Sequence, residues 1–167
     1  MIGRASVPMP VRITYILFLL VALVCIPVCA AETGGLYLQV VGQPEENVLL
    51  EFRVEAGDLF YIDYVHSSDH TPVHDIFQIN GDEIVLIEED FDWYGSGLES
   101  VSNTGAKVVF SGNKTRVFLH RNCPRFLLRV GRVAGHVITY KERKIPLLSV
   151  AKGGDSVWIR LVKKGGE

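Results

Sequence analysis

Short segments in which apolar and polar residues alternate follow one another along most of the chain after about residue 35. Because successive side chains of a strand point to opposite faces, this alternation predicts β-strands rather than helices. Turn-forming sequences such as EAGD, NGDE, SGNKT and KGGDS separate the segments. The predicted strands are residues 36–41, 48–54, 59–66, 73–79, 84–88, 107–111, 116–119, 126–130, 136–140 and 157–162.

This spacing of short strands predicts an all-β fold. A sandwich and a barrel both fit the pattern, and the sequence does not choose between them. Residues 32–167 contain no internal repeat and no low-complexity linker. We therefore expect a single β-rich domain over this range.

The first 31 residues differ from the rest of the chain. Arg4 and Arg12 precede a run of 19 uncharged residues, 13–31, that ends in small residues. This order is typical of a secretory signal peptide cut after Ala31 or Ala30. An uncleaved anchor helix is the alternative, because about 20 apolar residues span a bilayer. Either alternative places residues 32–167 in the periplasm or on the outer face of the cytoplasmic membrane. The domain would then contact the membrane only through an uncleaved N-terminal segment.

The charge and the cysteine content argue against a nucleic-acid partner and against an internal disulfide bond. Without residues 1–31 the chain carries 15 Lys and Arg against 19 Asp and Glu, a net charge of −4. An acidic domain argues against a nucleic-acid partner, which favours basic surfaces. Cys123 is the one cysteine outside the leader, so no internal disulfide is expected. Its role stays open, and a half-buried apolar position is the preferred interpretation.

Charged residues of opposite sign gather in two runs. They are either solvated faces or complementary docking patches for a partner protein. The acidic run is Asp82, Glu83, Glu88, Glu89, Asp90 and Asp92, and the basic run is Arg116, Arg121, Arg125, Arg129 and Arg132.

The segment YVHSSDHTPVHD, residues 64–75, concentrates three of the five histidines. If strands 59–66 and 73–79 pair through a loop at 67–72, their apolar positions share one face when Ile62 lies opposite Ile79 and Tyr64 opposite Phe77. The same register places His66 opposite Asp75. We therefore predict an imidazole and a carboxylate side by side at the end of an apolar stripe.

Three interpretations of this segment stay open. A ligand site would use His66, Ser67, Thr71 and Asp75. A buried His66–Asp75 pair that only closes the hairpin is the plainer structural alternative. A metal site is the minority interpretation, and its candidate ligands are His66, Asp69, His70 and Asp75. His74 is expected on the opposite face, and Pro72 excludes the helix that would align the histidines.

A second candidate for ligand contact is the turn Gly95-Ser96-Gly97. Glycines allow a close backbone approach, so exposed amides there would suit an anion such as a carboxylate. A plain corner between strand and loop is the alternative. No nucleophile elbow or catalytic triad is recognisable, and no catalytic residue is assigned.

The segments FYIDYVHSSDHTPVHDIFQI and FDWYGSGLES resemble a family of small exported proteins that is catalogued as a domain of unknown function. Its members are typically encoded beside permeases of the TAXI type of tripartite ATP-independent periplasmic (TRAP) transporter. Asp75 stands where the family usually has Glu, and Glu99 where it usually has Pro. The matching residues are Phe60, Tyr64, His66, Ser67, Thr71, Pro72, Val73, Gly95, Gly97 and Leu98.

The resemblance by itself implies an association between genes and no mechanism. Together with the export signal, the single-domain β pattern and the lack of a catalytic constellation, it leads us to expect a non-enzymatic accessory of a TRAP-type solute uptake system. Its expected partner is a small carboxylate ligand, the permease, or the solute-binding subunit, and no cofactor is expected. The alternatives are a small metal-dependent hydrolase built on the His66/Asp75 region and a purely structural envelope protein. The sequence does not decide whether the protein is an enzyme, and it favours a protein without catalytic activity.

Overall fold

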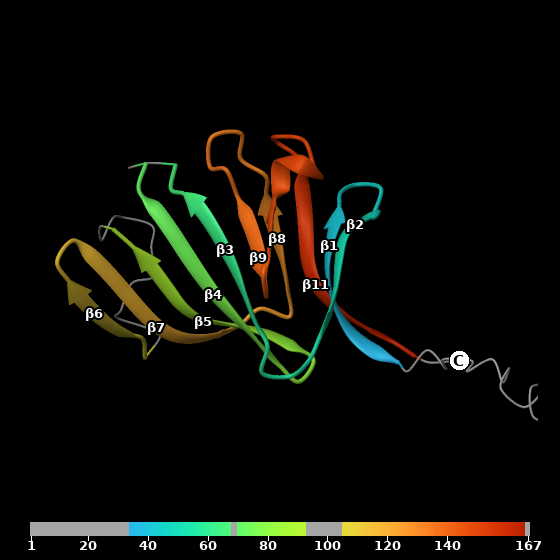
Figure 1. Ribbon diagram of the computed structural model, residues 1–167, viewed down its shortest axis with the longest axis horizontal. Helices are drawn as coiled ribbons and strands as arrows, with labels where there is room; N and C mark the ends of the chain where they lie inside the picture. The colour runs from blue at the N-terminus through green and yellow to red at the C-terminus, as the bar shows by residue number, and fades with distance from the viewer. Residues whose placement is uncertain (1–33, 68–69, 93–104, 166–167) are drawn as a thin grey trace, which may run out of the picture. The chain divides into compact units, whose positions relative to one another are not determined.

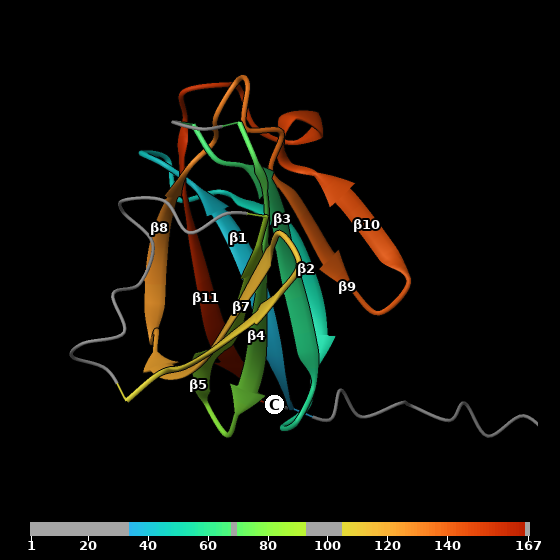
Figure 2. The same ribbon diagram turned by 90° about the vertical axis from the view of Figure 1, so that its left-hand side faces the viewer.

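A computed structural model describes residues 34–67, 70–92 and 105–165 (Figure 1). Antiparallel strands form two sheets, and the described part of the chain contains no α-helix. The prediction of an all-β fold is confirmed, and the two sheets face each other as a sandwich rather than closing as a barrel (Figure 1, Figure 2).

The smaller sheet has the order β2-β1-β11-β8. Its strands are β1 (Gly35–Gly42), β2 (Val48–Val54), β8 (Arg125–Arg129) and β11 (Ser156–Lys164). The larger sheet has the order β10-β9-β3-β4-β5-β7-β6. Its strands are β3 (Leu59–Val65), β4 (Pro72–Asn80), β5 (Glu83–Phe91), β6 (Lys107–Ser111), β7 (Lys114–Asn122), β9 (Val137–Tyr140) and β10 (Arg143–Pro146). One 3-10 turn, η1 (Leu147–Ser149), follows β10.

All ten predicted strands are present, with ends that differ by a few residues. The pattern missed β10, whose sequence RKIP pairs with β9 at the edge of the larger sheet. This strand is exposed at three of its four positions. It therefore lacks the alternation of apolar and polar residues that identifies a half-buried strand.

Stacked aromatic rings hold the two sheets together. The rings of Phe60 and Phe77, on β3 and β4, are parallel with centroids 4.8 Å apart, and Phe126 of β8 stacks on Phe77 at 5.1 Å. Phe60 and Phe77 are almost fully buried among Leu38, Ile62 and other core residues. The stack thus joins the centre of the larger sheet to the edge of the smaller one.

The β3–β4 hairpin forms as predicted, but its predicted register is wrong. Phe60 lies opposite Phe77, Ile62 opposite Asp75, and Tyr64 opposite Val73. The expected apolar faces are nevertheless kept, because the two registers differ by an even number of residues. His66 is paired with Thr71 through its amide, which donates to the Thr71 carbonyl oxygen at 2.8 Å. His66 and Asp75 are therefore not cross-strand neighbours.

The shorter turn explains this difference. Pairing His66 with Thr71 leaves four residues to close the hairpin, whereas the predicted register leaves eight. A shorter loop costs less closure entropy, and more residues enter the ladder. The His70 amide completes the turn by donating to the His66 carbonyl oxygen at 3.1 Å, and His70 adopts a φ of 59°.

The expected signal peptide or anchor at residues 1–31 lies outside the described residues. Within the described part of the chain, no helix has both the length and the apolar character needed to cross a membrane.

We expect Phe77→Ala to destabilise the domain by about 3 kcal/mol, because it removes the central ring of the stack and leaves a cavity. Chemical denaturation of the full chain, monitored by tryptophan fluorescence, measures the change. Val133→Ala is the control: Val133 is 77% exposed, and its loss should change stability by less than about 0.5 kcal/mol. Equal effects of the two substitutions would contradict a core role for the stack.

Candidate ligand-binding site

Two acidic residues face each other on the inner side of the larger sheet. Asp75 of β4 lies directly opposite Ile62 of β3 on one side and Glu89 of β5 on the other. Glu89 in turn lies opposite Val117 of β7, which is fully buried. Alternation along the strands directs Asp75 to the same face as Phe77. Two carboxyl groups thus interrupt an otherwise apolar inner surface.

A β-bulge in β5 turns Glu89 inward. Ile84 and Leu86 point to the core, and strict alternation would send Glu88 inward and Glu89 outward. The pairing with β4 shifts by one residue at Ile87, because Ile76 lies opposite Glu88 while Phe77 lies opposite Leu86. The extra residue reverses which side chains face the core. Glu89 is consequently buried, with 7% of its surface exposed.

A cavity of about 480 Å³ lies between the larger sheet and β8. Its apolar wall includes Phe77, Leu86 and Phe126. The polar residues that line it come from both sheets, from the connection between β7 and β8 and from the connection before β9; they are Tyr64, Asp75, Arg121, Cys123, Arg129 and His136. An apolar wall with a few convergent polar groups is the usual composition of a small-molecule site.

Burial, together with the charge of the neighbouring Glu89, raises the pKa of the Asp75 carboxyl from its ordinary 3.8 to about 7. Burial also raises the pKa of Glu89, against the influence of Arg121, whose Nη2 lies 3.8 Å from Glu89 Oε1. Burial and the two acids raise the pKa of the Tyr64 hydroxyl. Near neutral pH the acidic pair is therefore only partly ionised.

His136 stands beside Tyr64, with ring centroids 5.3 Å apart. The backbone amide of Gly131 donates to His136 Nδ1 at 3.2 Å. This bond requires Nδ1 to be unprotonated, so it places the proton of the neutral ring on Nε2. Burial lowers the pKa of His136. The imidazole thus presents a neutral donor to the region around Tyr64.

The predicted ligand residues are divided between two neighbouring cavities. Asp75 lines the cavity described above, whereas His66 and Ser67 line a second cavity of about 660 Å³. Tyr64, Arg129 and His136 border both cavities, so the two adjoin. Thr71 contributes its carbonyl oxygen to the hairpin turn. Gly95, Ser96 and Gly97 lie outside the described residues.

Of the minority metal candidates, those within the described residues do not form a metal-binding cluster. His70 is exposed in the turn, and Asp69 lies outside the described residues. In the part of the chain that the structure describes, no three His, Cys, Asp or Glu side chains are placed to hold a metal ion.

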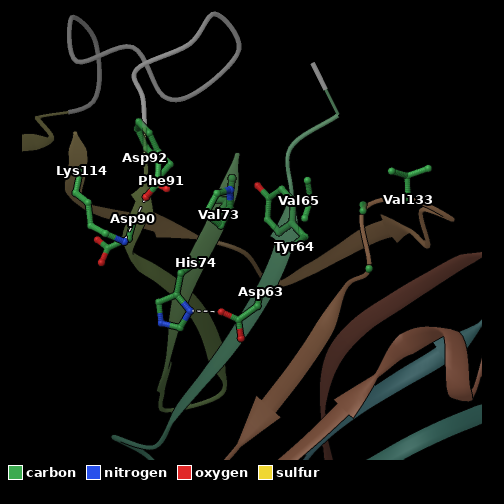
Figure 3. Close-up of a pocket in the computed structure, with 13 residues that line it drawn as sticks. Asp63, Tyr64, Val65, Val73, His74, Asp90, Phe91, Asp92, Lys114 and Val133 are labelled. Atoms are coloured by element: carbon green, nitrogen blue, oxygen red, sulfur yellow. Dashed lines mark hydrogen bonds and ion pairs between the residues drawn. The ribbon is translucent and has the colours of Figure 1, made fainter. Parts of the chain in front are cut away.

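An imidazole–carboxylate pair does form in the hairpin, but on its outer face and from other residues. His74 lies opposite Asp63, and its Nδ1 bonds to Asp63 Oδ1 at 2.5 Å (Figure 3). Tyr61 stacks on the His74 ring at 5.2 Å. Both members of the pair are about two-fifths exposed, so solvent screens their attraction.

Parts of the two charged runs pair with each other, since β5 and β7 are neighbours in the sheet. Arg116 Nε lies 2.8 Å from Glu88 Oε1, and its guanidinium donates to both carboxylate oxygens of Asp90 at 3.1 and 3.2 Å. Lys114, just before the basic run, lies 3.2 Å from Asp92. Much of the acidic run is thus neutralised within the larger sheet.

Sequence reasoning did not select Glu89, Arg121, Arg129 or His136 for the site. The first three belonged to runs that are usually solvated. The bulge sets Glu89 opposite Asp75, and Arg121 and Arg129 line one cavity because the two sheets face each other. Tyr64 was recognised only as part of an apolar stripe. Cys123 is half-buried as expected, and its Sγ lies 3.5 Å from the Arg121 carbonyl oxygen.

The fold and the cavity define a small β-sandwich with a mixed polar and apolar site between its sheets. Residues 60–147, more than half of the chain, match the family described as Domain of unknown function (DUF1850). The chain belongs to this family. The match begins in β3 and ends at the first residue of η1, so it spans the residues that line the cavity. No curated protein and no solved structure matches the chain.

We expect Asp75→Asn to flatten the pH dependence of stability. The folded-state pKa of Asp75, about 7, lies above the ordinary value of 3.8. The stability that it contributes is complete below the lower value and is lost as the pH rises through the higher one. Relative to Asp75→Asn, the wild type should lose about 2 kcal/mol of unfolding free energy between pH 5 and pH 8.

Denaturation midpoints of both full-length proteins across this pH range measure the difference. His136 acts in the opposite sense, since its lowered pKa costs stability as the pH falls, but this contribution is common to both proteins and cancels. Glu142→Gln, at an exposed position in the turn between β9 and β10, is the control and should keep the wild-type slope. Parallel pH profiles for wild type and Asp75→Asn would rule out an uncharged, buried Asp75.

Proposed function

We propose that this protein is a non-enzymatic, extracytoplasmic binding module that holds a small carboxylate-bearing molecule in the cavity between its sheets. The observation that carries the proposal is that two arginine residues line one cavity. Arg121 comes from β7 of the larger sheet and Arg129 from β8 of the smaller sheet. Guanidinium groups bind carboxylates through paired hydrogen bonds.

The cavity also suits the rest of such a ligand. Its volume of about 480 Å³ falls in the range of about 300 to 1,000 Å³ that small-molecule sites occupy. Phe77, Leu86 and Phe126 offer an apolar wall for a carbon skeleton. The neutral imidazole of His136 and the hydroxyl of Tyr64 supply further donors that fix orientation.

The arrangement favours binding over catalysis. The Nδ1 atom of His136, which a general base would need free or held by a carboxylate, accepts the Gly131 amide instead. Ser67, the one serine among the candidate ligand residues within the described ranges, lines the adjoining cavity rather than the one with Asp75. These contacts support a site that holds and orients a molecule.

We further propose that the module serves a TRAP-type uptake system of the TAXI class, as an accessory to its permease or its solute-binding subunit. The support comes from the resemblance of the segments around residues 60–79 and 91–100 and from the export signal expected in residues 1–31. A binding module on the outer side of the membrane would present or retain a solute for such a transporter.

Loss of the guanidinium at position 129 is expected to remove the ligand. Full-length protein is purified from its native envelope in mild detergent, and small molecules are released by denaturation and identified by mass spectrometry. We expect a carboxylate-bearing molecule with the wild type and about a tenfold lower amount with Arg129→Gln. Arg143→Gln is the control, because Arg143 of β10 lies over the Phe52 ring of β2 and is not among the residues that line the cavity. An unchanged set of molecules in Arg129→Gln would contradict the proposed site.

The transport role predicts a physical association. An affinity-tagged full chain, solubilised from its native membrane in mild detergent, should retain the permease or the solute-binding subunit. Mass spectrometry of the eluate, compared with that of an unrelated tagged exported protein, provides the measurement. Recovery of neither subunit would refute the accessory role and leave the binding proposal to stand on its own test.

A further inference from the structure

The inner acidic pair forms an acceptor site that the carboxylate-binding proposal does not use. Asp75 and Glu89 are directly opposite on neighbouring strands, so their Cβ atoms lie about 5 Å apart. The Glu89 side chain is only 9% exposed. Among the described residues, Glu89 Oε2 and Asp75 Oδ1 are both buried without a hydrogen-bond partner.

The Asp75 oxygen belongs to a residue that lines the cavity, and Glu89 lies directly beside that residue on the next strand. Asp75 and Arg121 both line it, and Glu89 lies between them: it is the cross-strand neighbour of Asp75 and reaches to 3.8 Å from Arg121. Arg121 approaches Glu89 Oε1, which leaves Oε2 for another donor. Buried acceptors without partners and like charges on opposed strands both cost free energy. A bound cation at this point would remove both costs.

The chemistry of the pair selects the kind of cation. Ca²⁺ and Mg²⁺ take about six or more oxygen ligands, and the described residues contain no cluster of three metal-binding side chains. An ammonium group is a compact charge with three donors. The two carboxylates supply two acceptors, and the hydroxyl oxygen of Tyr64, which lines the same cavity, supplies a third.

We infer that the ligand is a zwitterion of the amino-acid class, with its ammonium group on Asp75 and Glu89 and its carboxylate on Arg129. The inference rests on the proposed function, because it assigns the second polar end of the same ligand. The acidic end belongs to the larger sheet and Arg129 to the smaller one, so the two ends of the ligand contact opposite walls. In this arrangement Arg121 orients Glu89 and is not by itself the group that holds the ligand.

Ammonium binding is also coupled to a proton. Burial raises the pKa values of both acids, so the pair holds a proton near neutral pH that an incoming ammonium displaces. Proton release on binding is therefore expected near pH 6.5. The charged or titratable groups that face the pair, or act on it across the sheet, are Tyr64 and Asp63 of β3, Arg121 of β7, Arg129 of β8 and His136 before β9.

The test compares three panels of small molecules that share carbon skeletons. One panel contains the standard amino acids, the second the same skeletons without the amine, and the third the same skeletons without the carboxylate. Each compound is titrated calorimetrically into the detergent-solubilised full chain in two buffers of different ionisation enthalpy. The variants are Asp75→Asn and Glu89→Gln, and Asp63→Asn on the outer face is the matched control.

We expect at least one amino acid to bind about tenfold or more tightly than both partial analogues, with proton release. Asp75→Asn and Glu89→Gln should abolish this preference for the amine while carboxylic acids still bind, and Asp63→Asn should preserve it. Equal binding of amino acids and their amine-free analogues would overturn the inference and leave the proposed function intact. If no compound of the three panels binds, both fail. If the variants keep the preference for the amine, the ammonium site lies elsewhere and the inference is wrong.

Discussion

The register between β4 and β5 is the constraint on which the site depends. It sets Asp75 opposite Glu89 and, through the bulge at Ile87, turns Glu89 toward the space between the sheets. If β4 slipped by one residue, Asp75 would turn to the solvent face and His74 would turn inward. The bulge changes the local twist and direction of the strand as well. The polarity of the cavity therefore follows from one irregularity in an otherwise regular ladder.

The aromatic stack stabilises the folded domain, whereas the buried acidic pair destabilises it. Phe60, Phe77 and Phe126 draw the two sheets together around an apolar centre, and that closeness removes water from the neighbouring carboxyl groups. Burial then raises the pKa of both acids. A domain of this size has a core large enough to tolerate such a cost. Residues that lower stability in this way are commonly found in functional sites, where a bound ligand compensates for the loss of stability.

Particular elements show how far the sequence could be interpreted. Strong alternation located β2 and β6 to the residue, and the inner faces of β3 and β4 were correct. The hairpin register was not, because alternation fixes a register only to within an even number of residues and the turn decides among the remaining choices. The Asp63–His74 pair was overlooked for the same reason: the two residues meet only in the register that the short turn selects.

The sequence by itself determined the all-β class, the positions of the strands and the face to which Asp75 points, since these depend on a period of two along a local segment. The tertiary structure alone decided that Glu89 and Arg121 belong with Asp75 and that Arg129 closes the same cavity from the other sheet. The reason is physical: a bulge leaves no clear signature in the order of residues, and the packing of one sheet on another joins side chains that are distant along the chain.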